Sequence, residues 1–181
     1  MSANSWVFRT VTPQNWDDFT ALFEARGGPR PCYCMLWRLD VQGKSAPRDG
    51  ADRRAAMQAL VQADVPVGIL GYDQDLPVAW CSIAPRARFG KSLAPETDGT
   101  IWSLTCFFIR PSYRKQQGFS ALLAAAEATA LHHGAAEIEA YPVAPDSPSY
   151  RFCGFLPSFE AAGYRRIGPA GSRRNVVHKA L

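Results

Sequence analysis

The sequence predicts a single α/β domain in which a mixed β-sheet is flanked by helices. The chain has 181 residues, of which 47% are hydrophobic and 20% charged, and a chain of this size can bury a substantial core. Apolar segments with strand or helix character follow the order β-α-α-β-β-β-α-β-α-β-β. No repeat, low-complexity tract or long linker interrupts them, so we expect one domain over residues 1–181.

The chain is expected to open with a strand and a helix. Residues 6–11 form the strand. Thr12 followed by Pro13 is a favourable helix start, because Thr caps well and Pro suits the first helical position. The helix should span residues 14–25 and bury an apolar face made of Trp16, Phe19, Leu22 and Phe23.

A second helix and a hairpin are expected next. Residues 48–63 carry apolar side chains on one helical face. Residues 67–72 and 76–83 read as two strands that a short polar turn joins into a hairpin. Residues 85–99 should then form a long loop.

The second half is expected to complete the sheet. Residues 100–109 read as an apolar strand, residues 117–133 as an alanine-rich helix, and residues 136–143 as the next strand. A short helix and a closing pair of strands are expected at residues 155–162, 164–167 and 175–180.

A basic loop joins the strand at residues 100–109 to the alanine-rich helix. It contains Arg110, Arg114, Lys115 and Gly118. Free N–H groups at a helix N-terminus, together with positive side chains, make a ready site for phosphate. The P-loop pattern G-x-x-x-x-G-K-[ST] and the dinucleotide fingerprint G-x-G-x-x-G are both absent from the sequence, which excludes those two classes of nucleotide site.

Several motifs together resemble the GNAT-type N-acetyltransferases. Ile109-x-Pro111-x-Tyr113-Arg114, Gln117-Gly118 and Leu122-Leu123 resemble the acetyl-CoA motif of that family, and FEAAGY at residues 159–164 resembles its late segment. The resemblance covers residues 101–164 closely. It implies a GNAT-like α/β fold with a mostly antiparallel central sheet, and an enzyme that moves an acetyl group from acetyl-CoA to an amine by direct attack.

The resemblance also implies where acetyl-CoA binds. The strand backbone would pair with the amide-rich pantetheine arm like an added strand, and N–H groups of the loop would bind the pyrophosphate. Counting the family signature from Arg114 or from Lys115 gives two registers, which the sequence leaves open. The residues assigned to the cofactor are Phe107, Phe108, Ile109, Arg114, Lys115, Gln116, Gln117, Gly118, Phe119 and Ser120.

Acetyl transfer needs a general acid that returns a proton to the CoA thiolate. Many relatives use a Tyr in the late segment, but Phe159 stands at that position and has no proton to give. Tyr150 is the nearest phenol upstream, Tyr141 lies in the strand at residues 136–143, and Cys153 is a substitute. Packing or surface roles are the alternative for each.

The amine must also lose a proton to a base. Glu139 is the candidate, and it shares one strand face with Glu137 by the period of two. Alternatively, Glu137 and Glu139 form a stripe that faces solvent. In a further alternative, a chain of water molecules takes the place of a side-chain base. Acetylation of Cys106 as a nucleophile is a further, minor alternative.

The acceptor side, by resemblance, is built by the two N-terminal helices and the apolar connection PCYCMLWRL at residues 31–39. The candidate substrate residues are Cys34, Trp37, Arg38 and Arg86. The connection either lines a pocket or caps the core, and the arginines either bind a substrate carboxylate or are surface charges. A small amine is the expected partner. A non-catalytic acyl-CoA-binding module and acetylation of a protein amine stay open.

Composition and charge argue against nucleic-acid, membrane and metal partners. The net charge of +4 comes without a basic stripe, and Arg173-Arg174 reads as a solvated turn, so no nucleic-acid partner is expected. No apolar run of about 18 residues and no secretory signal is present, so we expect no membrane partner and a cytoplasmic location. The odd number of cysteines, five, predicts free thiols, and their lack of zinc spacing predicts no metal. A homodimer is common among relatives.

Overall fold

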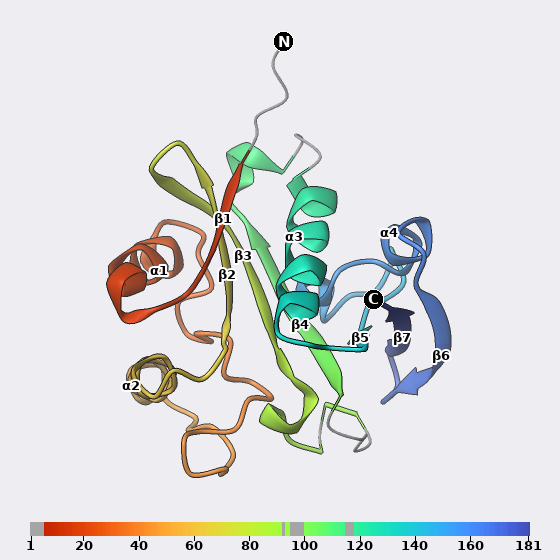
Figure 1. Ribbon diagram of the computed structural model, residues 1–181, viewed down its shortest axis with the longest axis horizontal. Coiled ribbons are helices and arrows are strands. Elements are labelled where there is room, and N and C mark those ends of the chain that lie inside the picture. Colours follow the sequence, from red (N-terminus) through yellow and green to blue (C-terminus); the bar gives the residue numbers. More distant parts are fainter. Residues whose placement is uncertain (1–5, 92, 95–99, 115–117) are drawn as a thin grey trace.

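The computed structural model of the chain has a central sheet with helices on both faces (Figure 1). The structure describes residues 6–91, 93–94, 100–114 and 118–181. Its strands are β1 Val7–Thr10, β2 Gly68–Asp73, β3 Leu76–Pro85, β4 Ile101–Ile109, β5 Glu137–Ala140, β6 Arg165–Ala170 and β7 Arg174–Ala180. Its helices are α1 Trp16–Glu24, α2 Gly50–Gln62, α3 Gly118–His132 and α4 Leu156–Ala161, with short 3-10 turns η1 Pro13–Asn15, η2 Arg86–Arg88, η3 Pro111–Tyr113 and η4 Arg151–Cys153.

The seven strands lie in the order β1-β2-β3-β4-β5-β7-β6. Only β4 and β5 are parallel, and their pairing runs from Ile101–Glu137 to Leu104–Ala140. The β3–β4 register shifts between Ser82 and Ile83, which leaves Thr105 as a bulge. β4 continues to Ile109 beyond the last residue that pairs with β5, so the two strands separate in the middle of the sheet.

The two faces of the sheet carry separate apolar cores. Successive residues of β2 point to opposite faces, and Ile69 and Leu70 accordingly belong to different clusters. On one face, Leu122 of α3 packs with residues of β4 and β5. On the other, Phe19 of α1 packs with Leu70 and with Trp80 of β3, where the ring centroids of Phe19 and Trp80 are 5.0 Å apart. Figure 1 shows α1 and α2 on one side of the sheet and α3 on the other.

The predicted order of strands and helices is confirmed, and the differences lie at element ends. The first helix starts as the 3-10 turn η1, in which the Asn15 side chain accepts a hydrogen bond from the Thr12 N–H at 2.8 Å. The second helix begins at Gly50, because Asp49 caps it by accepting from the Ala51 N–H at 2.8 Å. Within the described residues, no helix is long and apolar enough to cross a bilayer.

The expectation of a solvated turn at Arg173-Arg174 is wrong for its second residue. Arg173 is exposed, but Arg174 begins β7 and is buried. Its guanidinium lies 4.6 Å from the centroid of the Trp37 ring and donates to the Leu93 carbonyl at 3.0 Å. Arg173 lies in the turn before β7 whereas Arg174 is the first residue of the strand, a difference that charge composition alone does not reveal.

We expect Gly68→Ala to destabilise the domain. Gly68 has φ +155°, and an added Cβ would overlap the Cys81 carbonyl oxygen and the Trp80 ring. Strain and overpacking should together lower the free energy of unfolding by about 2–4 kcal/mol in urea denaturation. Gly168→Ala is the matched control, because nothing lies within 4 Å of its added Cβ. Equal unfolding midpoints for the two variants would contradict this packing.

Candidate functional site

A cleft of about 480 Å³ opens where β4 leaves β5. One wall is the end of β4 with the start of α3, and the other is η4 with the start of α4. The cleft is lined by Phe107, Phe108, Ile109, Arg114, Phe119, Arg151, Phe152, Gly154, Phe155 and Ser158. The structure therefore brings together five of the residues predicted to bind the cofactor.

The other predicted cofactor residues have different places. Gly118 is buried at the start of α3, where an added Cβ would collide with the Trp6 ring. Its lack of a side chain is thus needed for packing against Trp6. Ser120 lines a separate concavity between α3 and α4. Lys115, Gln116 and Gln117 lie outside the described residues, and so does the register of the loop.

The wall opposite β4 is held close to the strand by backbone geometry. Gly154 has φ +83°, and an added Cβ would lie 2.8 Å from the Phe159 ring. Phe159 is fully buried, with its ring centroid 5.9 Å from that of Phe107 and 5.6 Å from that of Phe119. The position at which the family resemblance implies a Tyr therefore belongs to the apolar packing behind the cleft.

The cleft is positive at the loop end. Arg114 is exposed, and its Nε donates to the carbonyl of Ile109 at 2.9 Å, which fixes the guanidinium beside the end of β4. The N-terminus of α3 begins at Gly118 on the same side. Helix N–H groups and a guanidinium both favour phosphate, so this end of the cleft suits a pyrophosphate.

Cys153 of η4 lies at the point where the strands separate. Its thiol donates to the carbonyl of Thr105, the bulged residue, at 3.5 Å. Burial raises the pKa of the Cys153 thiol to about 12, although Arg174 acts in the opposite direction. Cys153 is therefore protonated at neutral pH and ties the second wall to the bulge of β4.

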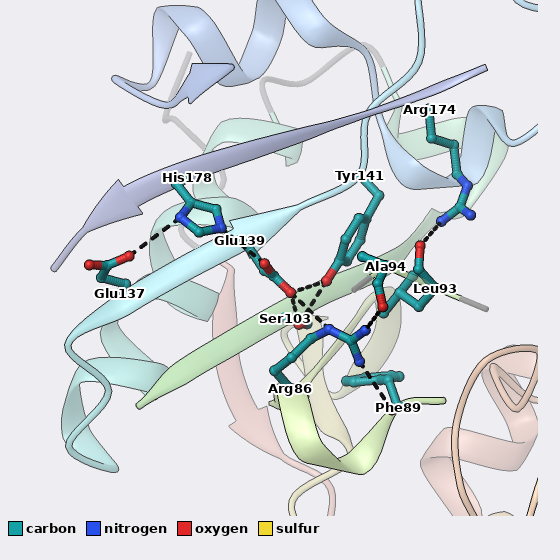
Figure 2. A network of polar contacts seen from close by, with 10 residues as sticks. All are labelled: Arg86, Phe89, Leu93, Ala94, Ser103, Glu137, Glu139, Tyr141, Arg174 and His178. Carbon is teal, nitrogen blue, oxygen red and sulfur yellow. Dashed lines mark hydrogen bonds and ion pairs between the residues drawn. The ribbon is translucent and has the colours of Figure 1, made fainter. Parts of the chain in front are cut away.

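Glu139 lies in a buried polar network (Figure 2). The network is on the face of the sheet opposite α3, because the neighbours of Glu139, Ile138 and Ala140, pack in the core that contains Leu122 of α3. Its Oε1 accepts from Ser103 Oγ at 2.9 Å and from the Tyr141 hydroxyl, and lies 3.2 Å from Nε of Arg86. Its Oε2 lies 2.9 Å from Nε2 of His178. Only 1% of Glu139 is exposed, so these partners replace water around the carboxylate.

The network joins two of the three predicted catalytic residues, Glu139 and Tyr141. Burial, with Glu139 next in effect, raises the pKa of Tyr141, so its phenol stays protonated and acts as a donor. His178 extends the network, because its Nδ1 lies 3.4 Å from Oε2 of Glu137. Glu137 and Glu139 therefore share one face, as the period of two predicts. Because the oxygens of Glu139 already have partners, we regard the carboxylate as an organiser of this region.

Two members of the network were not found from the sequence. His178 lies directly opposite Glu139 across the β5–β7 pair, and Ser103 lies opposite Glu139 across the β4–β5 pair. The sequence contains both residues on predicted strands. It does not say which strands are neighbours, and that information is needed to bring a histidine near the end of the chain to a carboxylate on β5.

The two arginines assigned to the substrate are buried, so the surface-charge alternative is wrong for both. Arg38 donates from Nη2 to the Val67 carbonyl and to Ser82 Oγ, each at 2.8 Å. Burial lowers the pKa of Arg38 to about 10. Arg86 donates to the Phe89 carbonyl at 3.0 Å besides its ion pair with Glu139. Each guanidinium thus ties loop backbone to the sheet.

Aromatic residues from two distant segments meet beside the cleft. The ring of Trp37, a predicted substrate residue, stacks on that of Tyr150 with centroids 6.0 Å apart. The Phe152 ring lies 5.8 Å from Trp37 and also lines the cleft. Tyr150, the third predicted catalytic residue, thus belongs to this group and not to the Glu139 network. Phe152 was not singled out from the sequence and Arg174 was expected only in a solvated turn, because the sequence shows no contact between residues so far apart.

Cys34 lies in a cluster of thiols. Its Sγ accepts from Nε1 of Trp80 at 3.0 Å, and burial raises the pKa of its thiol, as does a hydrogen bond with Cys106. The hydrogen bond lowers the pKa of Cys106, but burial and neighbouring thiols outweigh it, so the pKa is raised. A thiol that stays protonated is a poor nucleophile, which argues against acetylation of Cys106. In the described part of the chain, no three metal-binding side chains form a cluster.

Comparisons with known proteins agree with this geometry. A family model described as the acetyltransferase (GNAT) family matches residues 18–155. An acetyltransferase from Thermus thermophilus has a similar structure, with a TM-score of 0.61, 17% identity and 100% of each chain covered.

Two further solved structures show the same fold. PaiA N-acetyltransferase from Thermoplasma acidophilum, in complex with coenzyme A, has a TM-score of 0.59 at 10% identity, with 98% of this chain and 99% of that chain covered. Ribosomal-protein-alanine N-acetyltransferase from Brucella melitensis has a TM-score of 0.58 at 14% identity, with 97% and 99% covered. No curated protein matches the sequence significantly.

We expect Glu139→Gln to unfold at markedly lower urea concentration than the unmodified protein. The change removes the buried negative charge that faces the Arg86 guanidinium, which should lower the free energy of unfolding by about 3–5 kcal/mol. Glu137→Gln is the control: its side chain is 47% exposed, and it should cost less than about 1 kcal/mol. If Glu139→Gln and Glu137→Gln unfold alike, the network does not organise the site.

Proposed function

We propose, from the premise that this chain belongs to the acetyltransferase (GNAT) family, that it moves an acetyl group from acetyl-CoA to the amine of a small molecule. Membership of the family makes the protein an acyltransferase; the small-molecule acceptor is our proposal. The observation that supports the donor most directly is the cleft beside β4, which is open along the strand and positive at the loop end.

The residues of the cleft fit an acyl-CoA. β4 has no β5 partner beyond Leu104, so the backbone from Thr105 to Ile109 offers an edge to an amide-containing chain. The aromatic walls suit the apolar part of a pantetheine arm, and Arg114 suits its pyrophosphate. When bound, acetyl-CoA supplies an activated acetyl thioester.

The reaction forms one C–N bond and breaks one C–S bond. The amine loses a proton, and the CoA sulfur gains one, which yields an amide and a free thiol. A backbone N–H near Phe107 is proposed as the donor to the developing oxyanion. Tyr150 is proposed as the general acid, because its hydroxyl belongs to a partly exposed side chain beside cleft residue Phe152.

Glu139 and Tyr141 are proposed as positioning residues below the point where β4 and β5 separate. Their network holds β5 and β7 together with the loop after β3, through Ser103, His178 and Arg86. The proton of the amine is then proposed to leave through water. The cytoplasmic location expected from the sequence is a proposal as well, and so is the homodimer that the family resemblance implies.

A panel of amines tests the proposed function. With acetyl-CoA and monoamines, diamines and a lysine-containing peptide as acceptors, we expect release of free CoA thiol with small amines and little release with the peptide. Calorimetry with acetyl-CoA alone provides the control for donor binding. Tight binding without turnover for every amine would favour the rival reading, a non-catalytic acyl-CoA-binding module, for which the apolar Phe159 is the supporting observation.

Tyr150→Phe tests the proposed general acid. Loss of the hydroxyl should lower kcat by about 10²-fold or more, with little change in KM for acetyl-CoA, because the ring is retained. Tyr33→Phe is a control phenol, since its hydroxyl donates to Glu24 at 2.8 Å, away from the cleft. An unchanged kcat for Tyr150→Phe would remove Tyr150 from the proton transfer.

A further inference from the structure

Three aromatic side chains form a platform next to the cleft, which we call the aromatic shelf: Trp37, Tyr150 and Phe152. Trp37 lies before α2, whereas the other two lie at η4. Their ring centroids are 5.8–6.1 Å apart, within the range of stacked and edge-to-face aromatic pairs. Phe152 belongs both to the shelf and to the lining of the cleft, so the shelf begins where the acyl donor is proposed to lie.

The shelf is exposed although it is made of large apolar rings. Tyr150 and Phe152 are each 37% exposed. Tyr150 also has φ +57°, a left-handed conformation that is unfavourable for a bulky residue. A strained residue that presents an aromatic ring to solvent beside a cleft is typical of a binding surface.

The guanidinium of Arg174 packs against two rings of the aromatic shelf. The guanidinium of Arg174 lies 4.6 Å from the Trp37 ring centroid and 5.4 Å from that of Tyr150. Trp37 is therefore covered by Arg174 and Tyr150, and the surface left for a ligand is that of Tyr150 and Phe152. Trp37 and Arg174 thus act as positioning residues for the two exposed rings.

The side chains that flank the exposed rings are positive. Arg151 is a chain neighbour of Tyr150 and Phe152, and Arg173 donates to Ser149 Oγ at 2.9 Å. Among the described residues, no carboxylate is hydrogen-bonded or ion-paired to Arg151, to Arg173 or to the Tyr150 hydroxyl. An acceptor with several positive charges would be repelled here, whereas a neutral flat body would stack.

We infer that the preferred acceptor is a monoamine with a flat aromatic body, which stacks on Phe152 and Tyr150 while its amine reaches the thioester end of the cleft. This inference rests on the proposed function and names its substrate class. The bond changes are those of the acetyl transfer already described. A linear polyamine lacks both the flat face and the low positive charge that the shelf selects.

Steady-state kinetics with matched acceptors tests the inference. The acceptors are tryptamine and 2-phenylethylamine as aromatic monoamines, n-hexylamine as a flexible monoamine, and spermidine as a polycation. In the unmodified protein, kcat/KM should be highest for the aromatic pair and lowest for spermidine. The key variant is Phe152→Leu, which keeps an apolar side chain but removes the flat ring.

Phe152→Leu should lower kcat/KM for tryptamine about 2- to 12-fold, the range that loss of one aromatic pair predicts. Because Phe152 also lines the donor cleft, the value for n-hexylamine should fall too, but clearly less than the value for tryptamine, since a leucine still covers the apolar surface. Leu131→Ala is the control, since Leu131 is 57% exposed near the end of α3 and lines none of the clefts described above. A fold check by circular dichroism accompanies each variant.

The outcomes separate the inference from the function on which it rests. Efficient turnover of spermidine or n-hexylamine, with no preference for aromatic amines, would overturn the inference and leave the acetyltransferase proposal standing. An equal loss for tryptamine and n-hexylamine in Phe152→Leu would also overturn it, because the ring would then serve only the donor cleft. No turnover with any amine, while acetyl-CoA still binds, would overturn both.

Discussion

The separation of β4 from β5 is the feature on which the site depends. The parallel ladder pairs only residues 101–104 with 137–140, and the bulge at Thr105 turns the strand away just beyond it. An interior strand normally has both edges paired, so this leaves the backbone of β4 available on one side. The turn η4 approaches from the other side of the gap, where Cys153 donates to the Thr105 carbonyl. The cleft is therefore a consequence of strand pairing and not of a separate loop.

Keeping a sheet open in its middle requires support on both faces. On the α3 side, support is apolar, and Phe159 packs behind the cleft with Phe107 and Phe119. On the other side it is polar, where Glu139 connects β4, β5 and β7 with the loop after β3. A buried carboxylate is stable only when its partners replace the lost water, and here a guanidinium, two hydroxyls and an imidazole do so. The same network also contacts the aromatic shelf through Arg174, because the ring centroid of Tyr141 lies 6.0 Å from the Arg174 guanidinium.

The order of elements was predictable because each has a strong local signal, such as the apolar face of α1 or the Pro at the start of η1. Five residues that line the donor cleft were predictable because they lie close together in the chain, between the end of β4 and the first turn of α3. The rest depends on which strands are neighbours. His178 meets Glu139 only because β7 inserts between β5 and β6, and Trp37 meets Phe152 across most of the chain. Gly118 shows a different limit of sequence reasoning. The sequence predicts a role for this glycine, but the reason that a glycine is needed is a tertiary contact with the Trp6 ring, which the sequence does not show.

Amide hydrogen exchange of β4 is the most direct test of the central claim, that the strand edge freed at Thr105 binds the acyl donor. Peptides that cover residues 101–104 and 105–109 would be compared with and without saturating acetyl-CoA, with calorimetry confirming that the ligand is bound. We expect exchange to slow by roughly tenfold or more in residues 105–109, because a ligand paired with that edge protects its amides. The change should be smaller in residues 101–104, which are already paired with β5. Bound acetyl-CoA that leaves exchange in residues 105–109 unchanged would contradict the account and place the donor elsewhere.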